Sequence, residues 1–355
     1  MFRKSILCFL ILVVGLTGCQ SDKHSSEKQK TPSDLQSDPV IQSTTLETTQ
    51  EDPLADLIDD DLPIEPVDHS QFDSVDSLIE QIIQDFGYNQ TNLGIIYHNL
   101  VTEEDYTLNE NMPIFGASTN KVGTCLIIAD LINQGNLTWD TYVPAYSSLY
   151  EEGDGDITNS PLKDWYTVED LVYNMLVYSD NTAWNILAVY YINHYGSHQE
   201  GLIRISGIQD IPQDLYQSNF ACPSMLDGYL QKIVQNPTAY HKLSDYMLMS
   251  EPGLRFKQYV PEGMASKYGQ YDDAYHDIGI YYEEGVPLYT LVLMSKNYSV
   301  SDEFMATLNY HLKIWTKYQQ IKDGSIIYRV DGRKNLPSTL FLNTQKHRSP
   351  IYLKC

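Results

Sequence analysis

Three short groups of residues in this chain have the types and spacing that suit acyl transfer through a serine. In chain order they are Ser118-Thr119-Asn120-Lys121, Ser179-Asp180-Asn181 and Lys267-Tyr268-Gly269. A serine hydroxyl needs an adjacent base before it attacks a carbonyl carbon, and a lysine amine can serve when its pKa is lowered. Each group alone is common in proteins. Their order and their places in the predicted elements therefore carry the argument.

The first group precedes a predicted helix that begins after Ser118. Apolar residues recur three and four positions apart from Val122 to Ile132, and Gly135-Asn136 ends the pattern. The free N–H groups and the dipole at a helix start stabilise negative charge, which suits a nucleophile and an oxyanion hole. Lys121 lies one turn after Ser118 on the same side of the helix, so it is the expected base.

The second and third groups supply further polar side chains. Ser179 comes just before a predicted helix that begins after Asp180 or Asn181, and we expect its hydroxyl to relay a proton to the leaving group. Asn181 is expected to hold a substrate amide. Lys267 is expected to attract a substrate carboxylate and to lower the pKa of Lys121 through its charge.

The three groups resemble the S-x-x-K, S-D-N and K-T-G signatures of the penicillin-recognising serine hydrolases, class A β-lactamases in particular. The resemblance spans about 74–320. It implies β-lactams or D-alanyl peptides of the cell wall as substrates, and its chemistry requires neither a metal nor a cofactor. By resemblance the catalytic residues are Ser118, Lys121 and Ser179, and the substrate-binding residues are Asn181, Lys267 and Gly269.

Two positions depart from the family pattern. Tyr268 stands where the family usually has a small hydroxyl residue, and a phenol there could narrow substrate choice or shift substrate anchoring. The second departure lies in the loop 200–223, where a class A enzyme carries the Glu that activates the deacylating water. Glu200 is the only Glu between 181 and 250, and Asp210 and Asp214 are nearer the expected place.

This second departure leaves several functions open. If Asp214, or Glu200 after a loop rearrangement, activates water, the protein is a β-lactamase that hydrolyses the β-lactam amide. If neither does, the acyl-enzyme persists and the protein is a penicillin-binding protein or D-alanyl-D-alanine peptidase. A surface-binding lipoprotein without catalysis is the alternative from a different class.

The elements around these groups predict an α+β fold. Hairpins are predicted for 93–97 with 105–108 and for 278–282 with 288–294. Helices are predicted at 167–178, where Thr167 and Asp170 can form a capping box, at 224–235 and at 304–315. Strands at both ends with helices between them predict a sheet whose two halves meet late in folding. The resemblance implies an antiparallel sheet flanked by a helical subdomain, in three α/β/α layers.

The N-terminus reads as a targeting segment. Arg3 and Lys4 precede a short apolar run, 6–14, and Leu16-Thr17-Gly18-Cys19 resembles a lipobox. We therefore predict a lipoprotein signal at 1–18 and lipidation of Cys19, with an ordinary secretory signal as the alternative. The protein is then expected on the extracytoplasmic face of a bacterial cell membrane. The predicted organisation continues with a disordered acidic tether to residue 75, a catalytic domain at 76–320 and an unassigned β-rich appendage at 321–355.

Composition and cysteine usage limit the partners. The chain has 47 acidic against 23 basic residues, a formal charge of −24, which excludes a nucleic-acid surface because phosphate binding needs a basic stripe. Cys125, Cys222 and Cys355 remain after the signal and Cys19, so the odd number allows at most one bridge. No Cys or His spacing indicates zinc. We expect a monomer whose partners are its substrate and the membrane.

Overall fold

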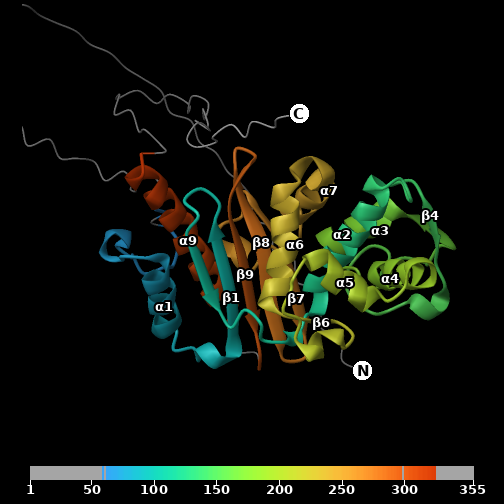
Figure 1. The fold of residues 1–355 in the computed structure, drawn as a ribbon, viewed down its shortest axis with the longest axis horizontal. Helices are drawn as coiled ribbons and strands as arrows, with labels where there is room; N and C mark the ends of the chain where they lie inside the picture. Colours follow the sequence, from blue (N-terminus) through green and yellow to red (C-terminus); the bar gives the residue numbers. More distant parts are fainter. Residues whose placement is uncertain (1–57, 60, 298–299, 325–355) are drawn as a thin grey trace, which may run out of the picture. The chain divides into compact units, whose positions relative to one another are not determined.

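A five-stranded antiparallel sheet forms the centre of the described chain (Figure 1). The computed structural model describes residues 58–59, 61–297 and 300–324. The predicted signal, Cys19 and most of the predicted tether and appendage lie outside these residues. The strand order is β2-β1-β9-β8-β7, so strands from both ends of the chain meet in one sheet. These strands are β1 Leu93–Asn99, β2 Asp105–Leu108, β7 Met264–Tyr271, β8 Ala274–Glu283 and β9 Val286–Ser295.

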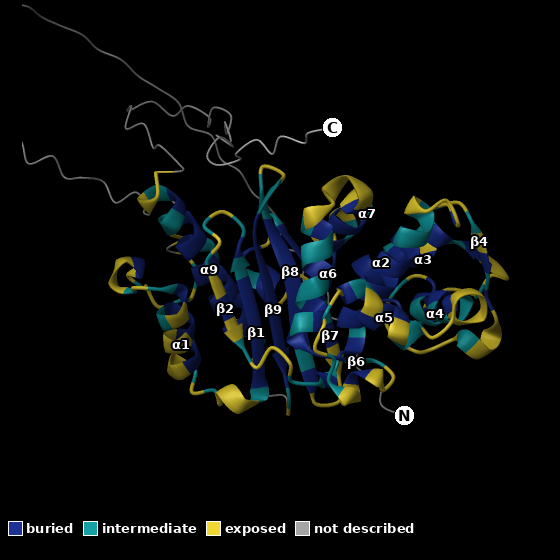
Figure 2. Cartoon of the chain, in the orientation of Figure 1, coloured by how far each residue is buried: buried dark blue, intermediate teal, exposed yellow. Residues whose placement is uncertain are grey.

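Strand β9 shows how the sheet serves two cores. Val292 and Met294 pack into the core shared with the larger group of helices, whereas Leu291 and Leu293 pack into the core on the opposite face. Successive side chains of a strand point to opposite faces, so an unbroken apolar strand buries both. Figure 2 shows this central sheet as the most buried part of the chain.

Helices cover both faces of the sheet, which gives the predicted α+β fold in three layers (Figure 1). One face carries α1 Val75–Asp85, α8 Phe256–Tyr259 and α9 Asp302–Lys322. The other carries α6 Pro223–Gln235 and α7 Pro237–Leu248, and next to them lie α2 Asn120–Asn133, α3 Val168–Val177, α4 Asn181–Tyr195 and α5 His198–Ser206. Two ribbons pair β3 Ile114–Phe115 with β6 Phe220–Ala221 and β4 Tyr142–Pro144 with β5 Trp165–Thr167. The 3₁₀ turns are η2 His69–Gln71, η3 Gln90–Asn92, η4 Ala117–Thr119, η5 Ser147–Leu149 and η6 Gln213–Tyr216.

Local sequence signals set the starts of the helices around the site. The Thr167 hydroxyl accepts from the Asp170 N–H at 3.0 Å, and the Asp170 carboxylate accepts from the Thr167 N–H, which is the predicted capping box. Asp180 caps α4 by accepting from the Ala183 N–H at 2.8 Å. Both predicted hairpins are also confirmed, as β1–β2 and β8–β9.

Helix α2 is enclosed by its neighbours, since every residue from 120 to 129 is buried. At Gly123 an added Cβ would lie 2.4 Å from a ring carbon of Tyr229 on α6. The close approach of α2 and α6 therefore requires glycine at this position. It holds the start of α2, with Lys121, deep in the molecule.

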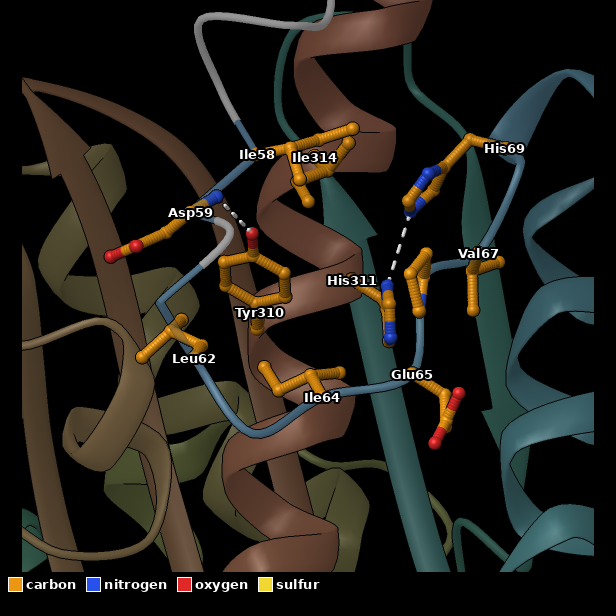
Figure 3. Close-up of a pocket in the computed structure, with 11 residues that line it drawn as sticks. Ile58, Asp59, Leu62, Ile64, Glu65, Val67, His69, Tyr310, His311 and Ile314 are labelled. Carbon is orange, nitrogen blue, oxygen red and sulfur yellow. Dashed lines mark hydrogen bonds between the residues drawn. The ribbon is translucent and has the colours of Figure 1, made fainter.

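The folded part begins before the predicted tether ends. Residues 61–74 form a strap that lies along α9, and Figure 3 shows Leu62, Ile64 and Val67 beside a small cavity there. His69 is 2% exposed, and its Nε2 lies 3.3 Å from Nδ1 of His311 on α9. These apolar side chains are spaced among acidic residues. The mean composition of the segment therefore predicts an exposed tether, although these side chains are partly buried against α9.

The described ends of the chain add two observations. Helix α9 runs to Lys322, so the predicted appendage from residue 321 falls, apart from 321–324, outside the described residues. In the ranges that the structure describes, no helix combines the length and apolarity needed to cross a bilayer.

We expect Gly123→Ala to destabilise the protein although alanine favours helices by about 1 kcal/mol over glycine. The new methyl group would overlap the Tyr229 ring, and overpacking of this kind costs about 1–3 kcal/mol. Chemical denaturation measures the change. Asn133→Ala, at the exposed end of the same helix, is the matched control and should not lower the unfolding free energy. A Gly123→Ala protein as stable as wild type would show that α2 and α6 can move apart.

Candidate active site

The structure brings the first two sequence groups together around the ammonium group of Lys121. Its Nζ lies 3.0 Å from Ser118 Oγ and donates to Asn181 Oδ1 at 2.7 Å. It also donates to the backbone oxygen of Ser179 and lies 3.3 Å from Ser179 Oγ. Ser118 lies in η4, immediately before α2, so one helical turn separates the serine from the amine. The Ser118 hydroxyl is thus within direct proton-transfer distance of Lys121.

Burial controls the charge of Lys121. The side chain is fully buried, and desolvation lowers its pKa from 10.5 to about 7 against the opposing effect of Asp180 and Glu151. Burial is therefore the main cause of the lowered pKa of Lys121, and the charge of Lys267, also expected to lower it, is not among the main causes. An amine with this pKa is neutral in half of the molecules near pH 7, which a proton acceptor requires.

Ser179 links the two lysines. Lys267 Nζ donates to Ser179 Oγ at 3.0 Å, and Lys121 reaches the same residue from the other motif. The backbone of Ser179 is left-handed, with φ +63°, a costly conformation for a non-glycine residue. In this conformation its carbonyl and hydroxyl both contact Lys121. The next residue, Asp180, is held by the N–H and hydroxyl of Thr158, each at 2.9 Å.

Strand β7 carries the third group to the same place. Lys267 is fully buried, and burial together with the nearby charge of Lys121 holds its pKa well below the ordinary value. At Gly269 an added Cβ would lie 2.9 Å from the Gly116 oxygen and 3.0 Å from the Thr119 nitrogen. Glycine therefore lets β7 lie directly against the turn that holds Ser118. The six residues that the sequence predicts for the active site therefore lie in the same region of the fold.

The sequence patterns do not predict the contacts that Lys267 and Arg255 make with aromatic rings. Lys267 Nζ lies 4.0 Å from the centroid of the Tyr268 ring, and the Arg255 guanidinium lies 4.6 Å from the same centroid. Arg255 is 3% exposed and also packs 4.4 Å from the Tyr275 ring. In the sequence, only the positive charge of Arg255 marks it as a candidate, because its spacing from β7 matches no recurrent motif.

The three candidates for a deacylating base are exposed, and none of them is a hydrogen-bond acceptor of Lys121 in the described residues. Asp214 is exposed, and its carboxylate accepts from Gln217 at 2.9 Å. Asp210 and Glu200 are exposed as well. In the described part of the chain, the oxygen atoms that accept from Lys121 belong to Ser118, Ser179 and Asn181, and none is a carboxylate.

A neutral cluster lies one turn further along α2. The Thr124 hydroxyl accepts from Trp184 Nε1 at 2.8 Å and lies 2.9 Å from His198 Nε2. Burial lowers the pKa of His198 to about 4, so the imidazole stays neutral around pH 7. Lys121 Nζ lies 5.5 Å from the centroid of the Trp184 ring. The surroundings of Lys121 on this side are therefore uncharged.

The described cysteines form no disulfide. Cys125 and Cys222 are buried free thiols, and Cys355 lies outside the described residues. Among the residues that the structure describes, no three His, Cys, Asp or Glu side chains are placed to hold a metal ion.

Comparison with known proteins assigns the chain to a family. The model of the β-lactamase enzyme family matches residues 75–310, which include all three motifs. The chain belongs to the β-lactamase enzyme family. A search of curated proteins found no match.

Solved structures of this family share the fold at low sequence identity. PBP-A has a TM-score of 0.56 and 21% identity, with 70% of this chain and 96% of that chain covered. A β-lactamase from Sphaerobacter thermophilus has a TM-score of 0.55 and 17% identity, covering 74% of this chain and 100% of that one. The class A β-lactamase from Mycobacterium abscessus has a TM-score of 0.54 and 18% identity, covering 67% and 97%. These likenesses establish the β-lactamase fold.

The pKa of Lys121 predicts how acylation of Ser118 depends on pH. Only the neutral amine accepts the hydroxyl proton, so the rate should rise about tenfold per pH unit below the pKa and level off above it. The midpoint should lie near pH 7, and stopped-flow acylation by a chromogenic β-lactam measures it. Lys121→Arg is the matched control, since a guanidinium does not lose its proton in this range. If the acylation rate of the wild type does not change with pH around pH 7, Lys121 is not the base.

Proposed function

We propose that this β-lactamase-family protein is a serine hydrolase that forms an acyl-enzyme on Ser118 with β-lactams or D-alanyl cell-wall peptides. The observation that carries the proposal is the 3.0 Å contact between Ser118 Oγ and a buried Lys121 with a pKa near 7. A nucleophile paired with a base of matched pKa is what acyl transfer needs. A variant of PBP-A, which shares the fold, was solved as an acyl-enzyme complex with penicillin G.

The acylation step follows from the contacts. Lys121 Nζ accepts the proton of Ser118 Oγ, a bond forms between Oγ and the carbonyl carbon, and the amide C–N bond breaks. The departing nitrogen takes the proton of Ser179 Oγ, which Lys121 can replace because the two groups are 3.3 Å apart. The N–H groups at the start of α2 stabilise the developing oxyanion.

Two further residues hold the substrate in this scheme. Asn181 accepts from Lys121 through Oδ1, so its amide is fixed and its Nδ2 faces the loop at Glu152, at 3.3 Å. In the proposed role it binds the substrate amide beside the reacting carbonyl. Lys267 is the candidate for binding the carboxylate of donors that carry one, and its hydrogen bond to Ser179 Oγ orients the proton donor.

We propose that deacylation is slow, which favours a penicillin-binding or peptidase role. Hydrolysis of the ester needs a base that activates water beside Ser118. Asp210, Asp214 and Glu200 are exposed, and the described acceptors around Lys121 are neutral. β-Lactam hydrolysis is the second candidate, favoured by the low pKa of Lys121, because the same neutral amine could activate water once the acyl group is in place.

Intact-mass spectrometry with benzylpenicillin tests the acyl-enzyme. Wild type should gain the mass of one penicillin and keep it after free penicillin is removed. Ser118→Ala should gain none, and Lys121→Met should react about 10²–10⁴-fold more slowly because the general base is lost. Ser147→Ala, an exposed serine in η5, is the control and should react as wild type does.

The same experiment separates the alternatives. Rapid loss of the adduct together with cephalosporin turnover would assign a β-lactamase. An adduct that still forms on Ser118→Ala would remove this serine from the nucleophile role. Absence of any adduct, with peptide esters as well as β-lactams, would favour the binding-only lipoprotein.

We also propose that the protein is exported and held on the membrane through a lipidated Cys19. The supporting features are the charged, apolar and Leu16-Thr17-Gly18-Cys19 segments of the sequence. More than one acyl chain would be needed for stable anchoring, since a single chain gives only marginal binding.

Cell fractionation tests the anchor. Cys19→Ser should move the protein from the membrane fraction to the medium or the soluble fraction, because the acylated thiol is removed. Cys8→Ser is the matched control, since this cysteine lies in the predicted signal and should leave with it. Retention of the Cys19→Ser protein in the membrane fraction would contradict lipidation at this residue.

A further inference from the structure

The Tyr268 ring packs against the lysine that the proposed function assigns to substrate carboxylates. Lys267 Nζ lies 4.0 Å from the centroid of the Tyr268 ring, and the lysine side chain has no exposed surface. A carboxylate must come within about 3 Å of an ammonium nitrogen to form a charge-assisted hydrogen bond. No carboxylate can come this close to Lys267 while its side chain is enclosed as it is here.

The contacts of Lys267 show that its ammonium group is satisfied without substrate. It donates to Ser179 Oγ at 3.0 Å and to the Tyr268 backbone oxygen at 2.9 Å, and the Tyr268 ring faces the remaining charge. An ammonium group has three donors, and a ring face attracts a cation, more strongly when both are desolvated. In the free enzyme the Lys267 ammonium group thus already has its partners before an anion binds.

Further contacts hold the Tyr268 ring in place. The Arg255 guanidinium lies 4.6 Å from its centroid and is itself fixed by the Gln270 side chain at 2.9 Å. The Tyr268 hydroxyl also interacts with the Ser179 side chain, which opposes the upward effect of burial on the pKa of the phenol. Moving the ring away from Lys267 would break contacts with Arg255 and Ser179 together.

We propose that Tyr268 is a specificity-determining residue that removes the advantage of a free carboxylate next to the reacting amide. The inference rests on the proposed acylation of Ser118 and names its substrate class: acyl donors whose group facing Lys267 is neutral, such as esters or internal peptide bonds. Compact donors with a carboxylate at that place must displace the phenol first. A small hydroxyl residue at this position would leave Lys267 open to them.

Acylation of the full chain by benzylpenicillin and by its neutral methyl ester tests this role. Wild type should acylate with the ester at least as efficiently as with the acid. Tyr268→Thr should raise the second-order acylation rate for the acid by about tenfold, which corresponds to about 1.4 kcal/mol, and change the ester rate by less than about threefold. Tyr271→Thr, an exposed aromatic on the same strand, is the matched control and should alter neither rate.

Two results would overturn the inference: an acid rate unchanged in Tyr268→Thr, or equal rises for acid and ester. Tyr268→Phe keeps the ring and covers the case in which the threonine variant does not fold. Tyr268→Phe should keep the wild-type ratio of the acid rate to the ester rate. A tenfold higher acid rate in this variant would show that the hydroxyl group, and not the ring, is responsible for the selection. A wild type that is acylated by neither compound would refute the proposed function itself.

Discussion

The removal of Lys121 from water is the constraint on which the site depends. Desolvation lowers the pKa of its amine to about 7, and the protein offsets the cost of burial with oxygen acceptors from Ser118, Ser179 and Asn181. If the amine were exposed, its charge would persist at neutral pH and it could not take a proton from serine. The enclosure of α2 on all sides is what keeps water away from this nitrogen.

The acceptors come from segments that are distant in sequence, so the fold must place them accurately. The η4 turn and the start of α2 bring Ser118 and Lys121 one turn apart. Ser179 comes from the turn before α4, Asn181 is the first residue of α4, and Lys267 comes from β7. Glycines at 123 and 269 allow the close approach of α6 to α2 and of β7 to η4. The backbone strain at Ser179 is retained because its carbonyl and hydroxyl both contact a buried cation.

Local patterns in the sequence account for much of this arrangement. The capping residues Thr167 and Asp180, the alternating strands and the Ser-x-x-Lys spacing act over a few residues, and each predicted element is present. The missed features depend on distant partners: Arg255 against Tyr268, the left-handed Ser179, and the strap that packs on α9. Their energies come from tertiary contacts that no short window of sequence contains. The carboxylate candidates at 200, 210 and 214 were chosen by position along the chain, which does not determine the direction of an exposed side chain.

The position of β9 between β1 and β8 determines when the site can be assembled during synthesis. A growing polypeptide that has reached the end of α7 already contains the serine, its lysine and the second motif, yet β1 still lacks one of its two neighbours and the third motif has not been made. The reactive centre is completed only when the last strand joins the sheet. The central sheet, which holds Lys267 on β7 beside Ser179, therefore cannot be complete before β9 has been synthesised.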